Sequence, residues 1–228
     1  MLQNVILTGL TIGLFWLGVF AARRFGKSPG YSLAALGFSR PRAGVFTGAG
    51  IGLLVGVGAL LVSIPVNLVS ASILNRFGYS TDSTVQGPFM DGLRGWVQQS
   101  PALAIPAMIL VIVVIGPAVE ELVFRGGIFN ALYRLGRLAS KGNENKRFVN
   151  IVEKVSFAAA AVVSSIVWSL LHLEPTILAA ILILGVALCA LFRRTGSLLP
   201  CFAAHATFNS FATLLIILSG LGVFEMPV

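Results

Sequence analysis

Two adjacent glutamates and one arginine stand at the end of a long apolar run. The run, ALAIPAMILVIVVIGPA, carries no charge and is followed by VEELVFRGG, which contains Glu120, Glu121 and Arg125. Ionisable side chains at membrane depth are costly, and they mark functional sites by default. Residues four apart share a helix face, so Glu121 can pair with Arg125. Glu120 points about 100° away from Glu121 and is freer to face a cavity.

The two carboxylates allow two interpretations. In one, all three side chains form a buried ionic cluster that only holds helices together. Such a cluster needs one acid for each base, so the second glutamate would have no partner. In the other, the two acids share one cation, which raises the proton affinity of one carboxyl group and is a usual way to tune a general base. We favour the second interpretation, with Glu120 as the base.

Two further polar clusters lie in apolar helical sequence. WSLLHL places Trp168 and His172 four residues apart, so the indole can pack beneath the imidazole. AAHATFNS places His205 and Asn209 on one helix face, where both side chains could donate hydrogen bonds to one oxygen, as an oxyanion hole requires. Taken singly, each cluster is also explained by core packing or by an interhelical hydrogen bond.

The coincidence of the three clusters points to one shared site. The chain has two histidines, and both lie in apolar helices together with the acids. Glu120, His172, His205 and Asn209 provide a proton acceptor, a second base and an oxygen clamp, while no serine stands in a G-x-S-x-G context. This inventory predicts a water molecule attacking a carbonyl, as in peptide hydrolysis inside a membrane. The same residues could bind zinc, but H-E-x-x-H is absent, and we expect no cofactor.

The composition indicates a polytopic membrane protein. The chain has 228 residues, of which 57% are hydrophobic and 11% charged, and its mean hydropathy is +0.93; a soluble domain is about a quarter charged. The net charge of +8 does not indicate nucleic acid, because thirteen of the sixteen basic residues fall in three short loops between apolar runs. Such loops face the cytoplasm and contact anionic lipid.

Apolar runs of about 20 residues predict six membrane spans. Their ranges are 3–22, 44–68, 102–124, 155–173, 176–192 and 200–219. The predicted fold class is therefore all-α, a bundle of about six transmembrane helices with an intramembrane catalytic cavity. We divide the chain into N-terminal helices with an outer loop (1–99), a protease core (100–219) and a C-terminal tail (220–228).

Glycines and prolines predict details of the helices. Gly44, Gly48, Gly52 and Gly56 recur at every fourth position of the second span, a spacing that lets a neighbouring backbone approach closely. Pro106 and Pro117 should bend the third span or free carbonyl groups, and Pro175 should break the chain after the fourth. Core packing is the expected role of the two cysteines, Cys189 and Cys201.

The predicted spans conflict with a single site. Straight helices place Glu120 and His205 near the inner ends of their spans and His172 at an outer end, about 20–25 Å away at 1.5 Å per residue. We therefore expect the third helix to continue past Arg125 towards Leu135. We also expect the fourth to break at Leu173–Pro175 while still deep in the protein, beside a water-filled cavity open to the cytoplasmic side.

The three motifs together resemble those of a known family. EELVFR is similar to the E-E-x-x-x-R motif of the CAAX prenyl protease and bacteriocin-processing family, also called the ABI family. WSLLH and HATFN stand in order where that family has F-x-x-x-H and H-x-x-x-N. The resemblance covers about residues 100–215, and its one departure is Trp168, where phenylalanine is usual. It implies an intramembrane endopeptidase like the type 2 CAAX prenyl proteases.

The resemblance also implies a role for each matched residue. Glu120 would activate the water with the help of His172, while Glu121 and Arg125 would position that acid and shape the site beside Trp168. His205 and Asn209 would form the oxyanion hole, and no metal would be needed.

The expected partners are the lipid bilayer and a peptide or protein substrate, which in the family's best-known case is prenylated; nucleic acid is not expected. The short loops indicate a multi-pass protein of a prokaryotic plasma membrane, with its site open to the cytoplasm. Three alternatives stay open: a zinc peptidase with the same residues, a proton-coupled transporter and a non-catalytic immunity or scaffold protein. Transporters usually contain paired repeats, and none is evident in this sequence.

Overall fold

The described part of the chain is built from helices. The structure is a computed structural model that describes residues 33–83 and 85–225, and no β-strand occurs among them. Five helices in this part are long and apolar enough to cross a membrane. The predicted all-α membrane bundle is therefore confirmed, and the predicted span 3–22 lies outside the described residues.

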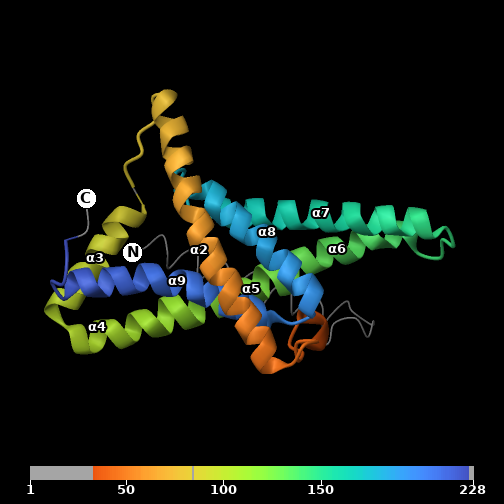
Figure 1. The fold of residues 1–228 in the computed structure, drawn as a ribbon, viewed down its shortest axis with the longest axis horizontal. Coiled ribbons are helices and arrows are strands. Elements are labelled where there is room, and N and C mark those ends of the chain that lie inside the picture. The colour runs from red at the N-terminus through yellow and green to blue at the C-terminus, as the bar shows by residue number, and fades with distance from the viewer. Residues whose placement is uncertain (1–32, 84, 226–228) are drawn as a thin grey trace, which may run out of the picture.

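The helices follow one another with short connections (Figure 1). In chain order they are η2 (Leu33–Leu36), α2 (Val45–Arg76), α3 (Gln86–Gln99), α4 (Pro101–Met108), η3 (Ile109–Ile115), α5 (Gly116–Glu121), η4 (Leu122–Phe129), α6 (Asn130–Arg137), η5 (Leu138–Ser140), α7 (Lys146–Leu170), α8 (Leu178–Thr195) and α9 (Leu198–Gly220).

The elements from α4 to η5 form one uninterrupted helix, Pro101–Ser140, of 40 residues. At 1.5 Å per residue this helix is about 60 Å long, twice the thickness of the hydrocarbon core of a bilayer. The predicted span 102–124 is therefore too short, because it stops just before Arg125. The expected continuation past Arg125 is confirmed, and it places Glu120 at the middle of the helix.

Two segments of this long helix, η3 and η4, have π-helical instead of α-helical hydrogen bonding. In η3 the Gly116 N–H donates to the carbonyl of Val111, five residues earlier. The next carbonyl, that of Ile112, would need the N–H of Pro117, and proline has none. The sequence prediction that Pro117 frees a carbonyl group is confirmed, and the freed carbonyl becomes part of the candidate site.

Helices α6 and α7 form an antiparallel hairpin that extends from the rest of the bundle (Figure 1). The predicted fourth span, 155–173, begins too late, because α7 begins at Lys146. Glu120 lies 20 residues before Ser140, where the first arm of the hairpin ends. Leu170, the last residue of α7, lies 24 residues after Lys146, where the second arm begins. These are rises of about 30 Å and about 36 Å. Glu120 and His172 therefore reach similar depths, which removes the conflict in the sequence prediction.

Helix α2 crosses α9 at a steep angle, and its glycines make this crossing close (Figure 1). A Cβ atom on Gly52 would lie 2.3 Å from the carbonyl oxygen of Pro200, and one on Gly56 would lie 2.5 Å from that of Ala204. Gly48 packs against Pro41 in the same way, so the predicted packing role is confirmed for three of the four glycines. Gly44 instead precedes the helix with φ 90° and no neighbour within 4 Å.

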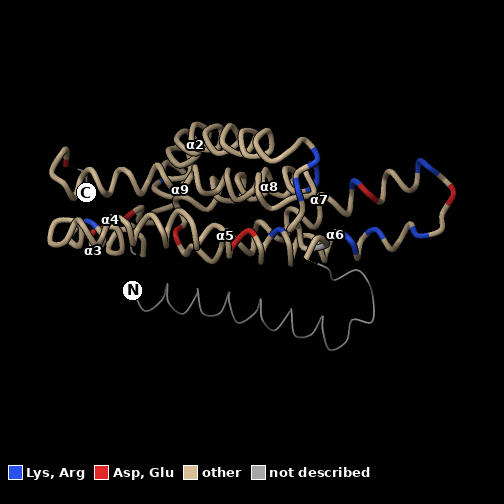
Figure 2. Tube along the Cα trace, turned by 90° about the horizontal axis from the view of Figure 1, so that it is seen from below, with Lys and Arg blue, Asp and Glu red and all other residues tan. Residues whose placement is uncertain are grey.

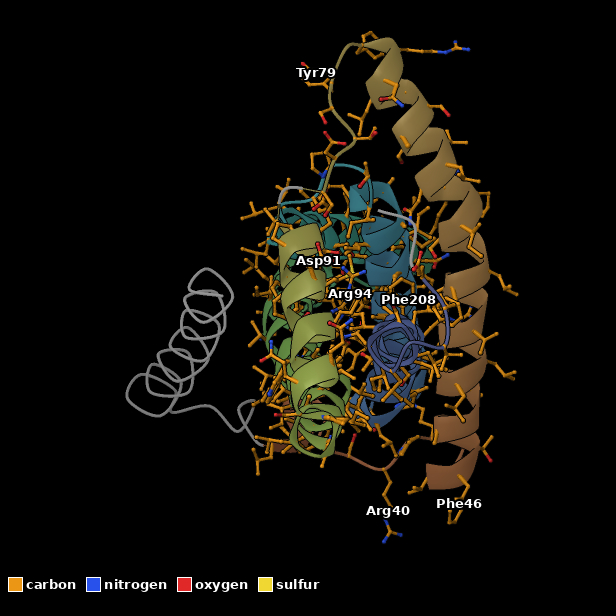
Figure 3. The ribbon with its side chains drawn as sticks, turned by 90° about the vertical axis from the view of Figure 1, so that its left-hand side faces the viewer. Arg40, Phe46, Tyr79, Asp91, Arg94 and Phe208 are labelled. Atoms are coloured by element: carbon orange, nitrogen blue, oxygen red, sulfur yellow. The ribbon has the colours of Figure 1, made fainter. Side chains whose placement is uncertain are left out.

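The predicted outer connection, 75–100, contains a helix that the sequence analysis does not predict. Helix α3 packs Val97, which is fully buried, and Trp96 against Ile216 of α9. The helix also carries Asp91 and Arg94, whose ion pair is 3.1 Å long. Figure 3 labels these two residues on α3 and Phe208 on α9. A helix this short and this polar gives no membrane-span signal, and only its apolar stripe marks it.

The glycine crossing yields a testable prediction. Gly56→Ala places a methyl group against the α9 backbone, and we expect it to lower stability by about 1–3 kcal/mol, as overpacking does. Gly58→Ala is the matched control, because no atom lies within 4 Å of a Cβ there. It should be neutral or slightly stabilising, because alanine favours helix more than glycine does. Thermal unfolding in detergent measures both variants, and equal melting temperatures would contradict the close crossing.

Candidate active site

The seven candidate residues come from three parts of the bundle. Glu120 and Glu121 end α5, with Arg125 one turn later in η4, and Trp168 and His172 lie at the end of α7 and in the turn after it. His205 and Asn209 lie on α9. Figure 2 shows that α5 carries acidic residues within a largely uncharged length, away from the basic end of the bundle.

Glu121 is the centre of a buried ionic cluster. Its residue is 0% exposed, and its Oε1 accepts a hydrogen bond from Arg125 Nη1 and another from His205 Nδ1, both of 2.9 Å. The predicted pairing of Glu121 with Arg125 is confirmed. Because a carboxylate accepts from Nδ1, the proton of a neutral His205 sits on Nδ1, and its Nε2 is left free. That Nε2 lies 3.9 Å from Glu120 Oε2.

Trp168 joins the three parts of the site. Its Nε1–H donates a hydrogen bond of 2.7 Å to Glu120 Oε2. The indole lies edge to face with both imidazoles, with ring centroids 5.4 Å from His172 and 5.2 Å from His205. The guanidinium carbon of Arg125 stands 4.1 Å above the indole ring. Phenylalanine, which is usual at this position in the family that the motifs resemble, could not donate this hydrogen bond.

Glu120 differs from Glu121 in its access to solvent. Its side chain is 34% exposed, whereas that of Glu121 is 1% exposed. One oxygen of Glu120 is bound to the indole, and the carboxylate as a whole reaches the surface of the described bundle. The helix faces predict that Glu121 is paired and that Glu120 is freer to face a cavity. In the structure Glu121 is enclosed and Glu120 is accessible.

His172 lies in the turn between α7 and α8. Its Nδ1 donates to the backbone carbonyl of Trp168 at 3.0 Å, so the second nitrogen, Nε2, is free to accept a proton.

Glu174 is a buried acid that the sequence analysis does not single out. It is 3% exposed, and its Oε2 accepts from the hydroxyl of Ser83 at 2.8 Å and from the backbone N–H of Gln86 at 3.3 Å. These bonds tie the turn that carries His172 to the first residue of α3. The turn also contains Leu173 with φ 52°, a conformation rare for a branched residue. The sequence HLEP, a glutamate before a proline between two apolar runs, is the signal that could have revealed it.

Asn209 does not point with His205 at one common oxygen. Its Nδ2 donates a hydrogen bond of 3.1 Å to the carbonyl of Ile112, the group that Pro117 leaves without a backbone partner. Asn209 therefore stabilises the π-helical segment beside the site. One of its two amide hydrogens is used in this bond, and the second remains for an oxygen of a substrate.

A zinc peptidase would need three protein ligands around one point. No three histidine, cysteine or carboxylate side chains of the described residues are grouped as metal ligands. Glu120 and His205 Nε2 could approach a cation together, and the engaged Nδ1 of each imidazole leaves Nε2 as the nitrogen that could bind one. A cavity of about 710 Å³ lies at the basic end of the bundle, and none of the seven candidate residues lines it.

Taken together, these features define a helical membrane protein with an accessible carboxylate beside two imidazoles. Residues 102–211 match the model of the family described as "Type II CAAX prenyl endopeptidase Rce1-like", and this segment contains every candidate site residue. The match confirms the resemblance inferred from the three motifs. The matched segment therefore includes Glu120, His172, His205 and Asn209, the four residues that the sequence analysis expects to act on a substrate.

A similar protein is known from Bacillus subtilis (strain 168), under the description "Putative membrane peptidase YdiL". It is 29% identical over 112 residues, which are 49% of this chain and 38% of the relative. The chain thus matches well under half of that relative's length. No solved structure matches the chain.

The ionic cluster yields a prediction about stability. Glu121→Gln leaves the buried Arg125 without its counter-charge, and breaking one partner of a buried pair costs about 3–5 kcal/mol. Glu120→Gln, at a half-exposed position, should leave the melting temperature in detergent almost unchanged. If the two variants lose equal stability, the enclosed and accessible acids do not have the separate roles described here.

Proposed function

We propose that the protein is an intramembrane endopeptidase in which Glu120 activates a water molecule. The observation that carries the proposal is the accessible Glu120 carboxylate, held by the Trp168 N–H and 3.9 Å from the free Nε2 of His205. A general base must lie within hydrogen-bond reach of the proton it takes, directly or through one water. The half-exposed carboxylate meets this condition for a water placed between it and the imidazoles.

The reaction follows from the chemistry of these groups. Glu120 takes one proton from the water, and the resulting hydroxide oxygen forms a bond to the peptide carbonyl carbon. The carbonyl oxygen becomes an oxyanion, for which the second Asn209 amide hydrogen is the candidate donor, and His205 can donate to it only if its Nε2 also carries a proton. When the C–N bond breaks, the proton held by Glu120 passes to the leaving amine, and His172 can assist this transfer. The products are a carboxylate and an amine.

Glu121 and Arg125 act through their neighbours in this scheme. Glu121 fixes the Nδ1–H tautomer of His205 and so directs Nε2 towards Glu120, in the way that a buried carboxylate orients the histidine of a hydrolase. Arg125 balances the charge of Glu121 and stacks on Trp168. The proposed substrate class is a membrane-associated peptide cut near its C-terminus, including lipidated CAAX-like peptides.

Removal of the base tests the proposal. We expect Glu120→Gln to lower the rate of peptide cleavage by about 10²–10⁴-fold, the usual contribution of a general base. Purified protein is incubated with a mixed peptide library that includes lipidated C-terminal peptides, and mass spectrometry identifies the products. Glu144→Gln, in the exposed α6–α7 loop, is the control and should keep full activity. Wild-type cleavage that a chelator abolishes would contradict the metal-independent mechanism.

The hydrogen bond from the indole yields a second kinetic prediction. Trp168→Phe keeps an aromatic ring but removes the donor to Glu120, and a hydrogen bond to a charged group is worth about 1.5–3 kcal/mol. We expect kcat to fall by about 10-fold or more while the fold is kept. Trp96→Phe on α3 is the matched control. Unchanged kcat in Trp168→Phe would show that packing alone positions Glu120.

A further inference from the structure

The basic end of the bundle encloses a cavity that the proposed hydrolysis does not use. Its volume is about 710 Å³, which lies within the range of small-molecule sites. Its walls come from α6, the first half of α7, the end of α8 and the segment before α2. Its lining residues are Ala34, Arg42, Phe129, Asn130, Tyr133, Arg134, Arg137, Glu153, Phe157, Ala190, Phe192, Arg193, Arg194 and Gly196.

The charge of the lining is strongly positive. Five guanidinium groups face this space against a single carboxylate, that of Glu153. Arg193 Nη2 pairs with Glu153 at 2.8 Å, and the hydroxyl of Tyr133 donates to the same oxygen at 2.9 Å. The one acid of the lining is therefore matched by one arginine. Figure 2 shows Lys and Arg gathered at this end of the bundle, on α6, near the end of α8 and along the hairpin loop.

Neutral groups hold several of these arginines in place. The guanidinium carbon of Arg193 lies 4.8 Å from the ring centroid of Phe157 and 5.6 Å from that of Tyr133. The guanidinium carbon of Arg137 lies 5.7 Å from the ring centroid of Tyr133. Arg42 Nη1 donates to the backbone carbonyl of Arg194 at 3.3 Å. Stacking and carbonyl contacts orient a guanidinium group without cancelling its charge, so the cavity keeps an excess of positive charge.

This chemistry suits a phosphate-bearing anion. Arginine binds phosphate through paired N–H groups, and an anion near several guanidinium groups replaces their mutual repulsion with charge-assisted hydrogen bonds. Positively charged loops of membrane proteins lie beside the headgroups of the cytoplasmic leaflet, and the arginines of this cavity belong to the basic connections before α2, around α6 and at the end of α8. Basic cavities between helices at this level bind the headgroups of anionic lipids.

Exposed apolar side chains close in sequence to the lining residues favour a lipid over a free anion. Leu135 and Leu138 on the α6 side of the hairpin are 64% and 58% exposed, and Ile151 and Val155 on α7 are 50% and 62% exposed. Acyl chains can cover these surfaces while the phosphate enters the cavity. The same residues give a soluble phosphate nothing to bind.

We propose that this cavity binds the phosphate headgroup of an anionic phospholipid. The bound lipid joins α6 to α7 and to the end of α8, part of the way along the hairpin whose arms lead to Glu120 and Trp168. It therefore stabilises the hairpin between its loop and the candidate active site. The proposal does not depend on the peptidase reaction.

Lipid binding by the full chain tests the proposal. Protein in neutral detergent is titrated with phosphatidylglycerol, with phosphatidylcholine, and with inorganic phosphate or glycerol phosphate, and binding is followed by native mass spectrometry and by the melting temperature. We expect saturable binding of phosphatidylglycerol and a higher melting temperature, with neither effect from phosphatidylcholine. A melting temperature raised equally by inorganic phosphate would overturn the lipid assignment.

Two variants with equal charge loss separate a built site from general attraction. Arg137→Gln/Arg194→Gln removes two exposed guanidinium groups from the cavity and spares the pair of Arg193 with Glu153. Arg40→Gln/Lys141→Gln removes two charges at the same end outside the lining; Figure 3 shows Arg40 projecting away from the bundle, near Phe46 of α2. We expect the first variant to bind phosphatidylglycerol about 10-fold or more weakly, and the second as wild type. Equal weakening in both, or no binding by wild type, would overturn the site.

Discussion

The buried carboxylate of Glu121 is the interaction on which the candidate site depends. A charge with no exposure must be matched by nearby donors, and here Arg125 and His205 supply them from η4 and α9. Both donors then become fixed themselves. Arg125 lies over the indole of Trp168, and His205 presents its remaining nitrogen towards Glu120. The enclosed Glu121 thus orients the groups around the accessible Glu120, so the two neighbouring glutamates have different structural roles.

The hairpin of α6 and α7 sets the depth at which these groups meet. Its two arms leave the same loop and rise by comparable lengths, so the middle of one helix lies level with the end of the other. Because the second arm ends in a turn, the imidazole of His172 is carried by irregular backbone. Glu174 ties that backbone to α3, and Trp168 provides its carbonyl to His172. The geometry of the candidate site therefore depends on a helix, α3, that contributes none of the seven candidate residues.

Much of this arrangement could be predicted from the sequence. Fixed helical periodicity is sufficient to pair Glu121 with Arg125 and to place Trp168 near His172, because each pair is four residues apart, although His172 lies in the turn just after α7. The ends of the long helices could not be predicted from hydropathy, since Lys146 and Arg134 are charged yet helical. The bond from Trp168 to Glu120 and the anchoring of Glu174 connect residues 48 and 88 or more positions apart. No local pattern specifies such pairs, whereas the family motifs mark only that the residues belong together.

The π-helical segments also constrain how the chain can change in length. Each such segment holds one residue more than an α-helix would in the same rise. Loss of one residue from Ile109–Ile115 would therefore restore regular winding there and leave the face of the helix that follows nearly unchanged. Loss of one residue from a regular α-helical stretch would instead turn everything beyond it by about 100° about the helix axis. A π-helical segment thus marks a place where this helix can change in length while Glu121 keeps facing α9.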